Sequence, residues 1–209
     1  MKNIIKIALL LCITNTIFTV YGQNSRTTDE GVVINGIRWA TRNVDKPGTF
    51  TEKPEDAGMF YQWNRKVGWS STDPLVNSDG GTTWNESYSE GDTWEKVLDP
   101  SPAGWRVPTK KELESLADTT YVTHKWTTEN GVNGNRCTDK ATGSSLFLPA
   151  AGNRFYNSGT LSYAGTYGYY WCSTPDGSGA YYLSFGSGYF YVGGNYRADG
   201  FSVRCVAEP

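Results

Sequence analysis

The stretch AYYLSFGSGYFYV occupies residues 180–192 and decides the expected fold of the C-terminal half. Residues 180–185 and 189–192 are rich in aromatic residues, which favour strands, and the glycines at 186 and 188 favour a tight turn between them. The pattern therefore predicts a β-hairpin. Because successive side chains of a strand point to opposite faces, two sets are expected. The core set is Leu183, Phe185, Phe190 and Val192, and the solvent set is Tyr182, Ser184, Tyr189 and Tyr191.

The region around this hairpin has an unusual composition. Residues 152–204 hold 10 of the 14 tyrosines of the chain together with many Gly and Ser residues, and their only acids are Asp176 and Asp199. Binding surfaces use this combination, because tyrosine gives a large contact area at little cost in rotamer entropy, while Ser, Gly and Asn adapt their hydrogen bonds. A sheet in which tyrosine rings merely cover one face has the same composition. Composition alone favours neither interpretation.

A second hairpin is expected upstream, where Asn35-Gly36 separates two short apolar runs at 32–34 and 37–40. The loop-rich stretch between residues 45 and 102 holds four tryptophans, which are costly to leave in water and should pin these loops to a core. They are Trp63, Trp69, Trp84 and Trp94.

One helix and one more strand complete the expected elements. Thr109 and Glu112 form a capping box, so a helix should follow Thr109 and end near Asp118. Apolar and polar side chains alternate over residues 201–205, which predicts a last strand.

The N-terminal 22 residues have the composition of a signal peptide, with two lysines, an apolar run at 7–20 and Gly22 at the expected cleavage site. The alternative is an uncleaved membrane anchor, but the run falls short of the ~20 apolar residues that a span needs. We therefore expect a secreted or cell-surface protein, with the periplasm as a further location, and no membrane span after cleavage. Residues 23–30 are expected to be disordered, and 31–207 to form a single domain.

The residues that could carry chemistry argue against several functions. The chain has 19 basic and 21 acidic residues, so no basic excess exists to drive nucleic-acid binding. His124 is the single histidine, which excludes a metal site built on imidazoles, and it is expected on the surface. Glu112 and Glu114 point to different faces of the expected helix and make a poor acid–base pair. We expect no enzyme activity and no cofactor, with calcium at the oxygen-rich segments 77–80 or 195–199 as an alternative.

The cysteines allow more than one arrangement. Cys12 lies in the expected signal peptide, which leaves Cys137, Cys172 and Cys205. An exported protein meets an oxidising compartment, so one disulfide is expected and one thiol is left over. Three pairings exist, and the residues themselves do not choose among them. A catalytic cysteine would need His124 as its activating partner, and none is expected.

Five blocks of sequence together resemble the Fibrobacter succinogenes major paralogous domain, an extracellular bacterial module with a C-type-lectin-like fold. The blocks follow the order of that family, and such sequences commonly come from gut Bacteroidetes. They are INGIRWATRNV at 34–44, DPSPAGWRVPT at 99–109, LPAAG at 148–152, GYYW at 168–171 and GFSVRCV at 200–206.

The resemblance implies an α+β, C-type-lectin-like mixed fold, with small antiparallel sheets, one or two short helices and long ordered loops. Its terminal strands would pair with each other, and its C-terminal hairpin would carry an exposed binding face. The implied core residues are Trp39, Trp105, Leu148, Trp171, Phe201 and Val203. The implied ligand-binding residues lie between the blocks and are Phe155, Tyr156, Asn157, Tyr163, Tyr167, Asp176, Tyr182, Tyr189, Tyr191, Asn195 and Tyr196.

The function implied is that of a monomeric recognition domain that binds a glycan or a surface protein of another cell. Relatives of this scaffold include receptors diversified by retroelements, so the C-terminal region is a candidate for hypervariability. The alternative is a structural subunit of a cell-surface fibre or envelope assembly, with the tyrosine face buried against a neighbouring subunit.

Two features separate the chain from its relatives. Members of the family often have cysteine where Ser101 stands, so a bridge from this position to Cys205 is impossible here. The resemblance therefore leaves Cys137 with Cys172 as the preferred pairing and Cys205 as a buried thiol. The fold is also similar to that of formylglycine-generating sulfatase modifiers, but their catalytic cysteine pair has no counterpart that can be placed in this chain.

Overall fold

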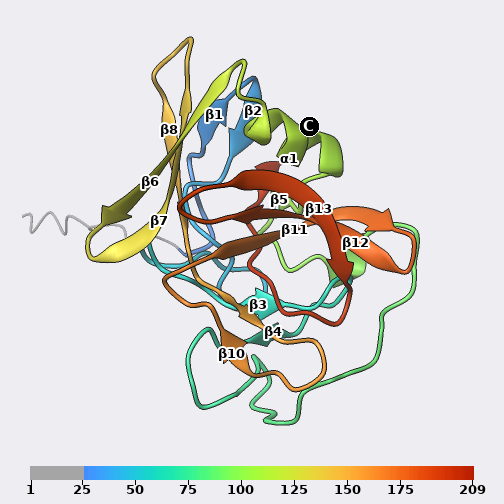
Figure 1. Ribbon diagram of the computed structural model, residues 1–209. Helices are drawn as coiled ribbons and strands as arrows, with labels where there is room; N and C mark the ends of the chain where they lie inside the picture. Colours follow the sequence, from blue (N-terminus) through green and yellow to red (C-terminus); the bar gives the residue numbers. More distant parts are fainter. Residues whose placement is uncertain (1–25) are drawn as a thin grey trace, which may run out of the picture.

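The computed structural model describes residues 26–209, so the expected signal peptide lies outside the described residues. Five small antiparallel sheets and one α-helix make up this part of the chain (Figure 1). The elements are β1 (Val32–Ile34), β2 (Ile37–Trp39), β3 (Phe60–Tyr61), β4 (Gly68–Trp69), the 3-10 helix η1 (Lys96–Leu98), β5 (Trp105–Arg106), α1 (Lys110–Ala117), β6 (Val122–Glu129), β7 (Val132–Asp139), β8 (Ser145–Pro149), β9 (Asn153–Arg154), β10 (Leu161–Ser162), β11 (Gly168–Asp176), β12 (Gly179–Phe185), β13 (Phe190–Tyr196) and β14 (Val206–Ala207).

The two ends of the domain meet in one sheet of order β1-β2-β14-β5. Val206 of the last strand pairs with Trp39 on one side and with Arg106 on the other. The turn between β1 and β2 has φ 48° at Asn35 and φ 78° at Gly36, values that asparagine and glycine tolerate best. The expected N-terminal hairpin and the pairing of the terminal strands are therefore confirmed.

The hairpin of β12 and β13 is also confirmed, and β11 extends it to a three-stranded sheet. Leu183 and Phe185 are fully buried, and Tyr189 and Tyr191 are exposed, as alternation predicts. The prediction that Tyr182 and Ser184 face solvent is wrong, because their side of the sheet is covered as well.

The cover on that side is the chain segment that follows β13. The ring of Phe201 lies 5.1 Å from the ring of Tyr182, so Tyr182 belongs to a core with Trp171 and Phe201. The other face packs Leu183 and Phe185 into a second core beneath α1. A sheet between two cores buries both alternating sets of side chains, which a sequence pattern does not reveal.

The helix forms where its cap predicts. Thr109 accepts a hydrogen bond from the backbone N–H of Glu112, and the Glu112 carboxylate accepts one from the backbone N–H of Thr109 at 2.7 Å. Arg106 holds the same carboxylate with two hydrogen bonds of 2.8 and 2.6 Å. The helix ends at Asp118, as expected, and Glu112 has a structural role.

A third hairpin, β6–β7, was not anticipated, although Asn130-Gly131 at its turn is the same signal as Asn35-Gly36. His124 lies on β6 and is half-buried, so its expected surface position is only partly correct. Its ring stacks on Phe190 at 4.0 Å, and its Nε2 lies 2.9 Å from the carbonyl oxygen of Leu116. Burial lowers the pKa of this histidine, so the ring is neutral at pH 7.

The strand expected at 201–205 is replaced by isolated bridges. Phe201 pairs with Tyr61, Ser202 pairs with Tyr170, and Ser202 and Arg204 are buried like their apolar neighbours. The segment runs between other parts of the chain, so no side of it reaches water. The implied core residues and the four loop tryptophans are all buried, as expected.

The three described cysteines do not form the expected disulfide. Cys137, Cys172 and Cys205 are buried free thiols, so the preferred pairing of Cys137 with Cys172 is wrong for this structure. Cys205 instead donates to the hydroxyl oxygen of Ser101 at 3.0 Å. The loop that often carries a cysteine in the resembling family therefore contacts Cys205 directly.

Order begins earlier than residue 31. Of the segment expected to be disordered, residues 26–30 are described, and the Asp29 carboxylate is buried in an ion pair of 3.0 Å with Arg42. Asp29 also accepts hydrogen bonds from the backbone N–H groups of Gly31 and Thr41. These contacts hold the start of the domain against β2 and the loop that follows it.

Candidate functional site

A hollow of about 250 Å³ opens beside the C-terminal sheet, and we call it the aromatic hollow. Most of its wall is made of aromatic side chains, and a few polar side chains lie among them. The lining residues are Asn153, Phe155, Tyr156, Tyr163, Tyr169, Tyr182, Ser184, Tyr189, Tyr191, Asn195, Tyr196, Asp199 and Phe201.

The walls come from segments that are distant in the sequence. Strand β9 and the turn after it contribute Asn153 and Phe155, while β12 contributes Tyr182 and β13 contributes Tyr191. The short strand β9 is held in place by Arg154, whose backbone pairs with Gly200 and whose buried guanidinium donates to backbone oxygens of the loop at 70–72. The hollow is therefore built on secured elements rather than on a free loop.

The floor and the rim differ in exposure. Tyr182 is buried in the floor against Phe201, and its hydroxyl lies 3.4 Å from the hydroxyl of Tyr191. Burial raises the pKa of Tyr182, so this phenol stays neutral and can donate a hydrogen bond. Five exposed rings form the rim, namely Phe155, Tyr163, Tyr189, Tyr191 and Tyr196, with exposed fractions between 39% and 52%.

Contacts between rings order the rim. The rings of Tyr189 and Tyr191 lie 5.6 Å apart, and those of Tyr156 and Tyr196 lie 4.8 Å apart. Such ring pairs hold their side chains in place at little further cost in entropy, so the rim is organised before any ligand arrives.

The structure brings together eight of the eleven residues predicted to bind ligand. Tyr167 lies just outside the hollow, with its ring 5.3 Å from Tyr163 and 5.8 Å from Tyr189. Asn157 and Asp176 are exposed and do not line the hollow. The eight that line it are Phe155, Tyr156, Tyr163, Tyr182, Tyr189, Tyr191, Asn195 and Tyr196.

Sequence reasoning missed five lining residues. Tyr169 was available as a signal, because it belongs to the tyrosine-rich region, and Phe201 was assigned to the core, where one side of its ring also lies. Asp199 was considered only as a calcium ligand. Strand alternation already placed Ser184 on the same face as Tyr189 and Tyr191, whereas nothing in the sequence marks Asn153, which only tertiary packing places there.

One known protein family matches the part of the chain that forms the aromatic hollow. The family model of the Lcl C-terminal domain matches residues 55–207, which is well over half of the chain. The chain belongs to the Lcl C-terminal domain family. No curated protein and no solved structure matches it. Strand β2 lies before residue 55 but pairs with β14, so the folded Lcl C-terminal domain includes a hairpin outside the matched range.

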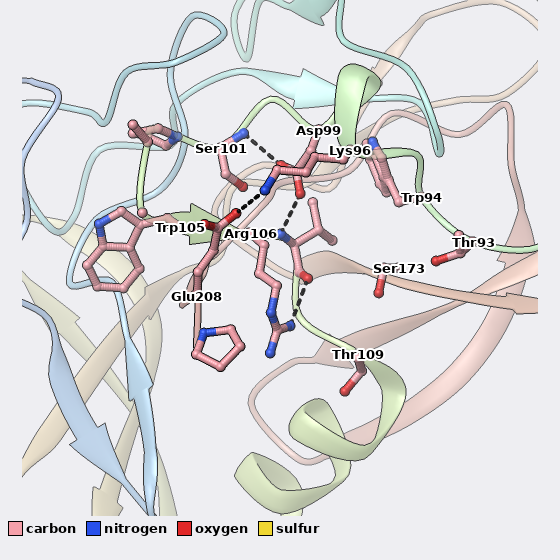
Figure 2. A pocket seen from close by; sticks show the side chains of 15 residues that line it. Thr93, Trp94, Lys96, Asp99, Ser101, Trp105, Arg106, Thr109, Ser173 and Glu208 are labelled. Carbon is pink, nitrogen blue, oxygen red and sulfur yellow. Dashed lines mark hydrogen bonds and ion pairs between the residues drawn. The ribbon is translucent and has the colours of Figure 1, made fainter.

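A larger cavity of about 760 Å³ lies on another part of the Lcl C-terminal domain, between η1, β5 and the C-terminal residues (Figure 2). Three of its charged side chains are paired with other groups of the domain. Lys96 lies 3.2 Å from Glu208, Arg106 is held by Glu112, and Asp99 accepts hydrogen bonds from the backbone of its own loop. Lys96, Arg106 and Asp99 are thus engaged in contacts of the fold.

One of the two segments named as calcium candidates uses an amide oxygen within its own turn. The side-chain oxygen of Asn77 accepts the backbone N–H groups of Asp79 and Gly81, so it is used by its own turn. No group of three or more His, Cys, Asp or Glu side chains suited to a metal ion occurs among residues 26–209.

Within the same range, no helix is long and apolar enough to cross a bilayer.

Proposed function

We propose that this Lcl C-terminal domain is a secreted or cell-surface recognition domain that binds a carbohydrate or protein ligand through the aromatic hollow. The observation that carries the proposal is the gathering of five exposed aromatic rings around one hollow. Single exposed apolar side chains are common on protein surfaces, whereas a cluster of them in one place marks a binding site. The rings can stack on sugar C–H faces or enter a pocket of a protein partner.

We further propose that the domain is C-type-lectin-like and akin to the Fibrobacter succinogenes major paralogous domain. Two contacts support this assignment. The terminal strands pair through Val206 and Trp39, and Ser101 lies against Cys205, where many members of that family could form a disulfide. In this view the varied segments between the family blocks supply the rim of the hollow.

The proposed role is binding without catalysis. The groups that a hydrolytic mechanism would need are engaged in structural contacts. His124 is neutral and stacks on Phe190, and Glu112 caps α1 and pairs with Arg106. Burial raises the pKa of Cys172 to about 11, so its thiol carries little nucleophilic thiolate at neutral pH.

Binding through the hollow is testable with a double variant, Tyr189→Ala with Tyr191→Ala. The variant and the parent would be compared on a glycan array and in a pull-down against surface proteins. We expect at least a tenfold loss of affinity for any ligand found, because each stacked ring contributes on the order of 1 kcal/mol. Thermal stability should change little, since both rings are exposed. Tyr182 is unsuitable for alanine substitution, because it is part of the core.

The matched control is Tyr121→Ala, which removes an equally exposed tyrosine outside the hollow. It should leave every affinity unchanged. Retained binding in the double variant would refute the proposal. The alternative of a fibre or envelope subunit predicts a different result, namely a sedimentation coefficient that rises with concentration in the parent and falls to the monomer value in the double variant.

A further inference from the structure

The polar groups of the aromatic hollow are unbalanced in charge. Asp199 is the one charged residue in its lining, and no Lys or Arg side chain lines it. Among the described residues, no basic side chain forms an ion pair with Asp199. The backbone of Tyr156 lies near the carboxylate, and most of the remaining lining is made of rings.

The nearest arginine in the sequence does not neutralise this carboxylate. Arg197 stacks on Trp63 at 4.2 Å and donates to backbone oxygens, among them those of Gly179 and Gly91. A carboxylate that is only 3% exposed and lacks a cation is costly to keep ionised, and burial raises its pKa to about 7. A bound cation would remove this cost.

A second acceptor in the same hollow also lacks a donor. Asn153 is 5% exposed, and its side-chain oxygen has no hydrogen-bond partner. An unsatisfied buried acceptor lowers the stability of the fold by about 1–3 kcal/mol and is uncommon in native proteins. Two residues that line the hollow, Asp199 and Asn153, therefore carry a buried acceptor that lacks a cation or a donor, and ring faces that attract cations surround them.

The chemistry of the hollow selects a ligand by charge and by the position of its donors. An anionic group would meet the Asp199 carboxylate and no basic side chain, whereas an ammonium group would gain an ion pair and contacts with ring faces. Asn153 lies on β9 and Asp199 lies in the turn after β13, and the antiparallel bridge between Arg154 and Gly200 sets these two segments side by side, so one ligand could meet both acceptors with two donors. A sugar ring carries donors around its whole edge and C–H groups on its faces, while an alkyl amine carries donors only at its tip.

We propose that the aromatic hollow binds a sugar that bears a protonated amino group, with the ammonium group at Asp199, a second donor of the sugar at the Asn153 side-chain oxygen, and the sugar faces against the rim rings. This inference rests on the proposed recognition function and names the ligand class of the same hollow. It also explains why the hollow keeps a buried carboxylate without a basic partner in the protein.

The test compares two matched oligosaccharides by isothermal titration calorimetry at neutral pH. One is a short glucosamine oligomer, whose amino groups are free, and the other is the N-acetylglucosamine oligomer of equal length, whose nitrogen is neutral. We expect the glucosamine oligomer to bind at least tenfold more tightly, because a charged hydrogen bond contributes roughly 1.5–3 kcal/mol. In Asp199→Asn this preference should disappear.

Two further variants keep the result interpretable. Asp176→Asn removes the other acid of the region, which lies outside the hollow, and should leave the preference intact. Asn153→Ala should weaken binding of the glucosamine oligomer without equalising the two oligomers. Melting curves of each variant identify any loss that comes from unfolding.

The outcomes separate this inference from the proposed function. Equal binding of the two oligomers, an unchanged preference in Asp199→Asn, or binding of a lysine peptide in place of the sugar would refute the amino-sugar inference. In each of these cases the recognition function survives if the Tyr189 and Tyr191 double variant loses binding. If that double variant keeps all binding, the recognition function itself fails.

Discussion

Asp199 and Asn153 place polar groups in a hollow that is otherwise built from rings. In the sequence, Asp199 is one of two acids in a tyrosine-rich region, and Asn153 follows the block LPAAG. Neither position has a local pattern that indicates burial. The backbone of Tyr156 lies near the Asp199 carboxylate, and the Tyr156 ring packs at 4.8 Å on Tyr196. Contacts between distant segments thus create the polar floor.

The buried carboxylate makes stability depend on pH. The pKa of Asp199 is raised to about 7 by burial, so the folded state favours its protonated form. The contribution of this group to stability is therefore full below its ordinary pKa near 4 and is lost as the pH rises through about 7. Between these limits the loss amounts to at most about 4 kcal/mol.

Asp199→Asn removes this titration. We expect the variant to be more stable than the parent at pH 8, and its advantage to shrink towards pH 4, as measured by urea denaturation across this range. Asp176→Asn, at an exposed position, should follow the pH profile of the parent. Parallel profiles for the parent and Asp199→Asn would contradict the assignment of the raised pKa to this carboxyl.

The helix α1 illustrates how a short element is specified. Thr109 and Glu112 satisfy each other's backbone N–H groups, and Arg106 of β5 reaches the same carboxylate. The helix has only eight residues, too few for a helix to be stable by itself in water. It persists because Leu113 and Leu116 are buried in the second core.

Thr109→Ala should lower the free energy of unfolding by about 1 kcal/mol, because the Glu112 backbone N–H loses its acceptor at the start of the helix. Thr109→Ser keeps the hydroxyl and should stay within a few tenths of the parent value. Urea denaturation measures both. If Thr109→Ser loses as much stability as Thr109→Ala, the stabilisation comes from the methyl group of Thr109 and not from the capping hydrogen bond.

The hairpins show where local signals are enough and where they are not. Asn-Gly turns mark both β1–β2 and β6–β7, and glycines mark the turn of β12–β13. In contrast, β3, β4, β9 and β10 have two residues each, too few to show a period. The segment at 201–205 alternates in sequence but is buried on all sides, so its pattern does not produce a regular strand.

The domain as a whole is closed by contacts between its ends. Strand β14 lies between β2 and β5, and Cys205 just before it contacts Ser101 in the loop that leads to β5. The four loop tryptophans also hold the long connections to the rest of the domain. Three of them donate hydrogen bonds to backbone oxygens: Trp63 to Cys172, Trp84 to Tyr156 and Trp94 to Leu98. Long loops thereby become part of a single folded unit.

Ser101→Cys should form a disulfide with Cys205 under oxidising conditions, because the two side chains already lie 3.0 Å apart. The bridge would close a loop of 104 residues, and we expect 2–4 kcal/mol of stabilisation by the usual magnitude for disulfides. Thiol titration should find two fewer thiols after oxidation, and the melting temperature should rise. The reduced variant is the control, and an unchanged thiol count would show that the backbone geometry does not permit the bridge.

Turn residues, the capping box and the alternation of the C-terminal hairpin were sufficient to predict two hairpins, the helix and the location of the tyrosine-rich face. These signals act between residues close in sequence, where backbone conformation and the period of a strand limit the options. The burial of the loop tryptophans followed from the size of the side chain alone.

The hollow itself depends on packing at long range. Tyr182 lies in the floor rather than the rim because Phe201, in the segment that follows β13, covers its side of the sheet. The unpaired acceptors Asp199 and Asn153 meet only when β9 packs beside the end of β13. A strand pattern distinguishes one face of a sheet from the other but does not specify which segments will pack on each face, so the floor of the hollow and its charge are decided only in the folded domain.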